Sequence, residues 1–323
     1  QLASHVYNQP GAYEAQCTVH CPTVVFAVGQ QLEAAATPPN VSFSEDENQK
    51  YGFHRDDSPT YWKSLKAGGT DTVKINVVPS SAFDQVTVSS PESGLTASPQ
   101  ILSQVPEVIT VGDLNGQDGV VDALFGSQVI DNLNVQVYTE REITVAYRRV
   151  DGLPGLGYQG FVSGDIVGPD ADEFEEEIKE IWGQAVVKVN FVKLPPCEVT
   201  GSDVDWYPYV RTHLVGGPQV MTQEQQDVSA ICRSSEEEHF TVFLVDTENH
   251  HDVPRGIASF DEGVAFLHMN SLFLSRSRTT AHEIGHLISD AEVFGDITFP
   301  ADNLMVSGGH GDELTPEQWA AAR

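Results

Sequence analysis

The chain has 323 residues, 40% of them hydrophobic, and its acidic residues outnumber the basic ones 47 to 17, for a formal net charge of -30. This length predicts two domains, and the charge argues against nucleic acid or an anionic membrane surface as a partner. No apolar run reaches the ~20 residues that cross a bilayer, so we expect no membrane insertion.

The N-terminal part of the sequence has the pattern of an all-β domain. Its first residues, Gln1 to Pro10, lack a basic start followed by a hydrophobic stretch, so we expect a mature or trimmed chain. From 22 to about 136, short β-rich runs such as 72–78 alternate with turn residues, without a helical period. This pattern predicts that residues 1–136 form a β-sandwich of the immunoglobulin-like kind.

The pattern changes in residues 137–323, where strands and helices alternate as in an α/β domain. Residues 170–185 carry an apolar stripe at helical spacing among many glutamates, which predicts an amphipathic helix that buries Phe174, Ile178, Ile181 and Trp182. The other expected elements are strands at 142–150, 186–192, 241–246 and 264–269. A long irregular stretch, 195–239, interrupts this series.

The chain has four cysteines, an even set that suits two disulfide bonds. Their spacing is not C-x-x-C, which argues against a structural zinc knuckle. We expect one local bridge between Cys17 and Cys21 and a second between Cys197 and Cys232. Such bridges would place the protein in an oxidising compartment, so the sequence predicts a secreted, extracellular protein.

The segment from Thr280 to Ile288 contains the motif His-Glu-Ile-Gly-His. His282 and His286 are four apart, so on a helix both imidazoles share one face and can chelate one zinc ion. Glu283 follows the first histidine, the position from which a carboxylate acts as general base on a metal-bound water. The motif therefore predicts a zinc peptidase with Glu283 as the catalytic residue.

On this motif, residues 142–323 resemble the metzincin clan of zinc metallopeptidases, including pappalysin-like and snapalysin-like bacterial members. Asp302-Asn-Leu-Met305 looks like the methionine turn of that clan, and Leu314 to Gln318 is similar to its closing helix. The resemblance covers a little over half of the chain. It implies an α/β metzincin-like catalytic domain, a zinc cofactor, a protein or peptide substrate and a supporting role for Met305. It also implies that the strand at 263–269 is the sheet edge that binds the substrate.

The third zinc ligand departs from the metzincin pattern. Ser289 stands where that pattern has glycine, and Glu292 stands where it has the third histidine. Glu292 is the leading candidate because a carboxylate can bind zinc. Asp290 and Asp296 are rivals, and His310 is a weaker one.

The sequence also allows a second ion and two other functions. Asp113 to Gly119 has oxygen ligands and a turn glycine as in a calcium loop, but its spacing differs from that of an EF-hand by one residue, so a plain turn competes with calcium. The predicted function is a secreted zinc endopeptidase. One alternative is a secreted adhesion or carbohydrate-binding protein with a degenerate peptidase-like domain. Another is a gluzincin-type peptidase, against which the short tail after His286 and the methionine turn weigh.

Overall fold

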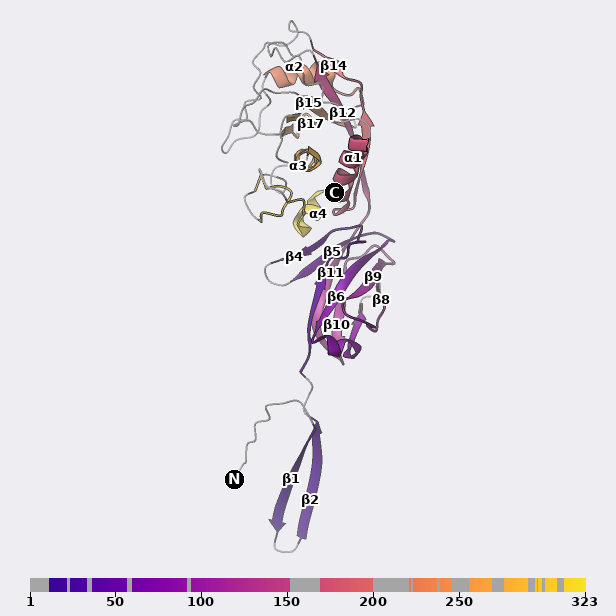
Figure 1. Cartoon of the computed structure of the whole chain (residues 1–323), viewed down its shortest axis with the longest axis vertical. Coiled ribbons are helices and arrows are strands. Elements are labelled where there is room, and N and C mark those ends of the chain that lie inside the picture. Colours follow the sequence, from indigo (N-terminus) through magenta and orange to yellow (C-terminus); the bar gives the residue numbers. More distant parts are fainter. Residues whose placement is uncertain are drawn as a thin grey trace.

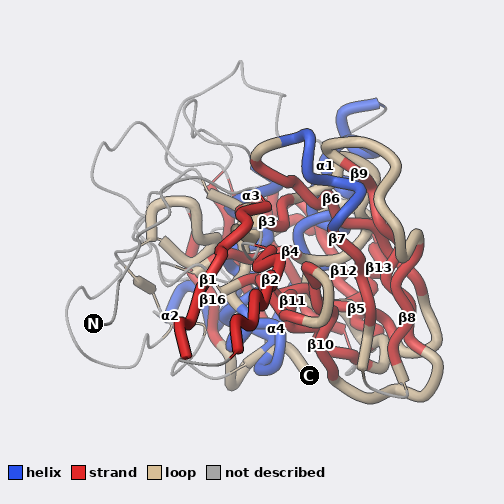
Figure 2. The backbone as a smooth tube through the Cα atoms, turned by 90° about the horizontal axis from the view of Figure 1, so that it is seen from below, coloured by secondary structure: helices blue, strands red, loops and turns tan. Residues whose placement is uncertain are grey.

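The computed structural model describes residues 12–21, 24–33, 37–56, 60–91, 94–151, 169–199, 221, 223–236, 239–245, 256–268, 276–289, 294, 296–297, 300–306 and 311–323. In this part of the chain strands predominate over helices (Figure 2). The first two strands, β1 (Ala12–Cys21) and β2 (Val24–Glu33), pair with each other as an antiparallel hairpin. No helix among the described residues has the length and apolar character needed to span a membrane.

The N-terminal part of the chain is confirmed as β-rich, but the hairpin β1–β2, which the predicted sandwich of residues 1–136 included, forms a sheet of its own. The rest of this part is a sandwich of two sheets that share one core. Its elements are β3 (Asn40–Ser44), β4 (Phe53–Arg55), β5 (Tyr61–Lys66), β6 (Thr70–Val78), the 3-10 helix η1 (Ser80–Gln85), β7 (Val86–Ser89), β8 (Leu95–Ser98), β9 (Glu107–Asp113), β10 (Gly119–Phe125) and β11 (Gln128–Tyr138). The strand orders are β4-β5-β11-β10-β7 and β3-β6-β9-β8. The immunoglobulin-like character of the sandwich stays a prediction.

Period-two alternation of apolar residues explains how the two sheets pack. In β6, Val73, Ile75 and Val77 are buried, while the residues between them are partly exposed. They pack with Leu133 and Val135 of β11, which belong to the other sheet. Successive side chains of a strand point to opposite faces, so each strand gives one face to the shared core.

The C-terminal part of the chain builds a mixed sheet with helices on its faces. Its elements are β12 (Arg141–Asp151), α1 (Pro169–Gly183), β13 (Val187–Lys193), β14 (Cys197–Glu198), α2 (Gln223–Cys232), β15 (His239–Val245), β16 (Gly256–Ser259), β17 (Val264–His268), α3 (Arg276–Ile288) and α4 (Pro316–Ala321). The sheet order is β13-β12-β15-β17-β16, in which the first four strands are parallel and β16 is antiparallel to β17. Figure 1 shows this sheet as a body next to the sandwich, with α4 close to the sandwich strands.

Two separate cores cover the two faces of this sheet. In β15, Val242 and Leu244 pack against the helices α1 and α3, whereas Phe243 and Val245 belong to a second cluster that includes residues of α2. The stripe predicted for the first helix is confirmed, since all four of its members are buried in the first cluster: Phe174, Ile178, Ile181 and Trp182. This layering is that of an α/β domain.

The structure differs from the sequence expectations at two elements. The strand expected at the sheet edge, residues 263–269, is internal, because β16 pairs along its outer side. The stretch 195–239, expected to be irregular, contains the helix α2. The sandwich ends with β11 at Tyr138 and the second sheet begins with β12 at Arg141, a few residues from the predicted boundary at 136/137.

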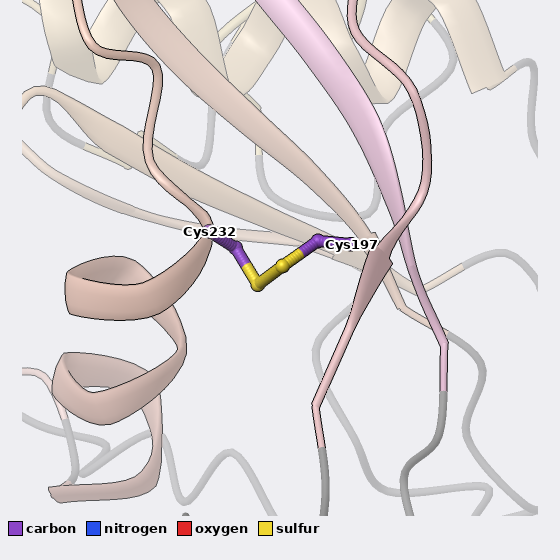
Figure 3. The surroundings of a disulfide bond; sticks show 2 residues. All are labelled: Cys197 and Cys232. Atoms are coloured by element: carbon purple, nitrogen blue, oxygen red, sulfur yellow. A yellow bond between two sulfur atoms is a disulfide. The ribbon is translucent and has the colours of Figure 1, made fainter.

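Of the two expected disulfides, one is confirmed and the other is not favoured by the backbone. Cys197 on β14 and Cys232 at the end of α2 form a disulfide with a Cα–Cα distance of 5.7 Å (Figure 3). Cys17 and Cys21 lie four residues apart on the extended strand β1, where their Cα atoms are roughly 13 Å apart. A disulfide needs Cα atoms within about 7 Å, so the extended backbone of β1 argues against the expected local bridge, whose side chains lie outside the described part of the structure.

Candidate metal centre

The two motif histidines lie on α3, a helix that is buried along most of its length. Ala281, Ile284 and Leu287 pack into the core beneath the sheet and so fix the rotation of the helix. This rotation brings the imidazoles of His282 and His286 together. Their Nε2 atoms are 3.2 Å apart, and their rings meet edge to face with centroids 4.8 Å apart.

Asp296 supplies a carboxylate to the same point. Its Oδ1 lies 3.2 Å from Nε2 of His282 and 3.9 Å from Nε2 of His286. Together with the distance of 3.2 Å between the two nitrogens, these sides define a triangle whose corners are all about 2.0 Å from one central point. This radius is the bond length that zinc forms with histidine nitrogen and carboxylate oxygen. The three side chains therefore fit one zinc ion.

The third ligand beside His282 and His286 is a carboxylate for which the sequence offers several candidates. Glu292, the leading candidate from the sequence, and its rival Asp290 lie outside the described residues, as does His310. The assignment of Glu292 thus stays a prediction. Asp296 is the rival that the structure brings to the two histidines.

A backbone carbonyl orients His282. Nδ1 of this buried ring lies 3.0 Å from the carbonyl oxygen of Leu304. With the proton on Nδ1, the ring donates to that carbonyl and leaves the lone pair of Nε2 available to a cation bound between this nitrogen and Asp296. Histidines that bind metals in proteins are commonly held in this way.

Burial and neighbouring charges perturb the pKa of each ring and of Asp296. Burial disfavours the charged form of His282, but the hydrogen bond with Asp296 and the charge of Glu283 outweigh it and raise the pKa of this ring. Burial, followed by the charge on His282, lowers the pKa of His286 to about 4. The hydrogen bond from His282 is the main cause that lowers the pKa of Asp296. At neutral pH, His286 and Asp296 are therefore in the states that bind a cation.

Glu283 is buried beside these groups, with 4% of its surface exposed. Burial raises the pKa of its carboxyl to about 7, although the charge of His282 acts in the opposite direction. The carboxylate lies against Gly256, the first residue of the outer strand β16. A group with a pKa near the working pH is well suited to accept and return a proton.

Met305 packs against Gly285, the residue just before His286. Its side chain is fully buried, and a Cβ added to Gly285, between the two histidines, would come within 2.9 Å of the methionine Sδ. The turn is held locally, because the N–H of Met305 donates to Oδ1 of Asn303 at 2.8 Å, and Asn303 exchanges side-chain hydrogen bonds with Gln318 of α4. The supporting role implied for Met305 stays a prediction that this placement fits.

Hydrogen bonds account for the carboxylates of the possible calcium loop. The carboxylate of Asp113 accepts the backbone N–H groups of Gly68, Asn115 and Gly116. Asp118 accepts a backbone N–H of β11 at 2.7 Å. In the described part of the chain, no three potential ligands gather at this loop. Calcium stays a prediction, and the turn explains these residues without it.

Sequence reasoning did not find two residues that shape the site, Gly256 and Arg278. Gly256 leaves the space that the Glu283 carboxylate occupies, and nothing local in the sequence connects the two residues. Arg278 is a charged residue, 6% exposed, on a helix that packs into the core. A charge placed among residues expected to be buried is the signal that could have identified it.

Comparisons with known proteins do not assign the chain to a family. No family model and no curated protein matches it. Among solved structures, it is similar to the S-layer protein SbsC, with 15% identity and a TM-score of 0.25 over 42% of this chain and 18% of that chain. Domains 4 and 5 of SbsC give 16% identity and a TM-score of 0.18 over 39% of this chain and 58% of theirs. The chain thus spans less than a fifth of the longer S-layer structure, and likeness at these TM-scores carries no argument about fold or function.

Proposed function

We propose that this protein is a secreted zinc metallopeptidase that hydrolyses protein or peptide substrates. The observation that carries the proposal is the meeting of His282, His286 and Asp296 at one point, with the buried carboxylate of Glu283 beside them. Three protein ligands that leave a fourth position free are the mark of a catalytic zinc site, whereas structural sites use four.

In the proposed reaction, the metal and Glu283 have different roles. Zinc, when bound, supplies a Lewis acid that polarises the substrate carbonyl and acidifies water. Glu283 takes the proton from the attacking water and passes it to the leaving amine. This transfer needs a group that is a base in the first step and an acid in the second. Its burial favours this exchange, because the pKa of about 7 keeps both protonation states accessible near neutral pH.

The outer strand β16 offers the surface for an extended substrate. In the sheet order this strand lies outside β17 and begins at Gly256, which contacts Glu283. A peptide that adds to such an edge gains backbone hydrogen bonds. The substrate-binding role expected of residues 263–269 therefore moves to β16 in this proposal.

Secretion is supported by two properties of the chain. The disulfide between Cys197 and Cys232 fits an oxidising compartment. The net charge of -30 favours solubility in an extracellular medium.

Metal analysis of the purified full chain, with hydrolysis of fluorescein-labelled casein, tests the proposal. We expect one zinc per chain, loss of that zinc on double substitution of His282 and His286 by alanine, and loss of hydrolysis without loss of zinc in Glu283→Gln. A chain that neither retains zinc nor hydrolyses casein would refute the proposal and favour the adhesion or carbohydrate-binding alternative.

A pair of variants decides between the carboxylates. Loss of a residue that only orients a metal ligand lowers metal affinity by up to roughly 100-fold. Asp296→Asn removes a proposed ligand itself, so we expect zinc affinity to fall by more than roughly 100-fold. Glu292→Gln should leave the affinity unchanged. The reverse result would return the role of third ligand to Glu292.

A further inference from the structure

Arg278 links the helix that carries the histidines to the segment beneath them. It lies on α3 one turn before His282, and its side chain is buried. The guanidinium donates from Nε to the carbonyl oxygen of Gly311 at 2.6 Å. It donates from Nη2 to the carbonyl oxygens of Leu304 at 2.7 Å and Val306 at 3.0 Å.

The carbonyl of Leu304 is shared between Arg278 and His282. It accepts Nη2–H of the arginine and also lies 3.0 Å from Nδ1 of the histidine. An oxygen has two lone pairs, so both donors can be accommodated at once. The guanidinium thereby fixes the acceptor that sets the orientation and tautomer of His282.

The remaining hydrogen bonds of this turn are internal to the C-terminal segment. The N–H of Leu304 donates to the carbonyl of Glu313, and the N–H of Val306 donates to the carbonyl of Asn303. These bonds shape the turn but do not connect it to α3. In the described part of the chain, the hydrogen bonds from Arg278 to the carbonyls of Leu304 and Val306 make that connection, together with the one from His282 to Leu304.

We propose that Arg278 is a positioning residue for the metal centre, which acts by holding the Leu304 carbonyl against Nδ1 of His282. This inference rests on the proposed zinc function. Lysine cannot take over this role, because an ammonium on a flexible stem does not present the planar fork that reaches three carbonyls in fixed directions. Loss of a residue that only orients a ligand typically costs 10–100-fold in metal affinity.

The test compares zinc affinity in Arg278→Lys with that in Arg276→Lys. Arg276 is exposed on the same helix and serves as the matched control. Zinc affinity of the full chain is measured by competition with a chromophoric chelator, and the visible spectrum of the cobalt-substituted protein reports the ligand geometry. We expect Arg278→Lys to lose roughly 10–100-fold in affinity and to change the cobalt spectrum, while Arg276→Lys matches the wild type.

The outcomes separate this inference from the proposed function. A wild-type chain that binds no zinc refutes the metallopeptidase proposal and the inference with it. A wild-type chain whose zinc depends on His282, together with an unchanged Arg278→Lys, refutes the inference alone. Should Arg278→Lys fail to fold by circular dichroism, nitrogen NMR of wild-type histidines decides instead. A proton on Nδ1 of His282 that is protected from exchange supports the inference, and a proton on Nε2 overturns it.

Discussion

Replacing Gly256 by alanine is the substitution that most directly tests the position of the catalytic carboxylate. Gly256 begins β16, and its Cα faces the side chain of Glu283. A Cβ at this position would lie 2.7 Å from both Cδ and Cγ of Glu283. Ordinary contacts between carbon atoms are about 3.5 to 4.0 Å long, so the carboxylate must withdraw by about 1 Å.

The size of this displacement sets the expected loss of activity. Glu283 is almost completely enclosed and sits on a helix packed into the core, so the carboxylate cannot return to its place by a small rearrangement. A misplacement of about 1 Å costs on the order of 100-fold in rate, which corresponds to about 2.7 kcal/mol in the activation barrier. Zinc affinity should stay unchanged, because the proposed ligands His282, His286 and Asp296 are not touched.

The assay measures initial rates on fluorescein-labelled casein together with zinc content. Ser259→Ala is the control, since it changes the other end of the same four-residue strand. We expect Gly256→Ala to lose roughly 100-fold in rate at full zinc occupancy and Ser259→Ala to stay close to the wild type. Wild-type rates in Gly256→Ala would refute the assignment of Glu283 as the base held at this spot.

Three further predictions concern stability. Burial and neighbouring carboxylates raise the pKa of Glu313 to about 7 from 4.5. Between these values the folded chain keeps a proton that the unfolded chain has lost, so stability falls as pH rises through that window. Glu313→Gln should therefore gain on the order of 1 kcal/mol after solvent screening at pH 8 but not at pH 4, and equal melting shifts at both pH values would contradict this. Replacing Cys197 and Cys232 together by serine opens a bridge with a sequence separation of 35, which should cost about 2–4 kcal/mol in urea unfolding; an unchanged midpoint would argue that the bridge is dispensable. Gly52→Ala would place a Cβ 2.6 Å from Trp319 of α4, so a loss of about 1–3 kcal/mol is expected in the same assay, and full stability would show that this contact can relax.

The sequence predicted those parts of the site that one regular element determines. Four-residue spacing on a helix placed His282 and His286 on one face, and the apolar stripe of residues 170–185 correctly identified the buried side of α1. Asp296 could only be one of several candidates, because it lies past the end of α3 at Ile288, where helical spacing no longer fixes the direction of a side chain. Strand β16 was missed because four residues carry too little alternation to be recognised.

The same limit explains why the role of the sandwich was not visible in the sequence. The N–H of Gly52 and the hydroxyl of Ser64, both in the sandwich, donate to the backbone carbonyl of Gln184. The side chain of Gln184 in turn donates to the carbonyl of Asp312 and accepts the N–H of Leu314. Asp312 directly follows Gly311, and Leu314 comes three residues after it. The carbonyl of Gly311 accepts a hydrogen bond from Arg278. Hydrogen bonds through Gln184, together with the main chain from Asp312 to Gly311, thus connect the sandwich to the carbonyl that Arg278 binds, and Arg278 in turn contacts the carbonyl next to His282.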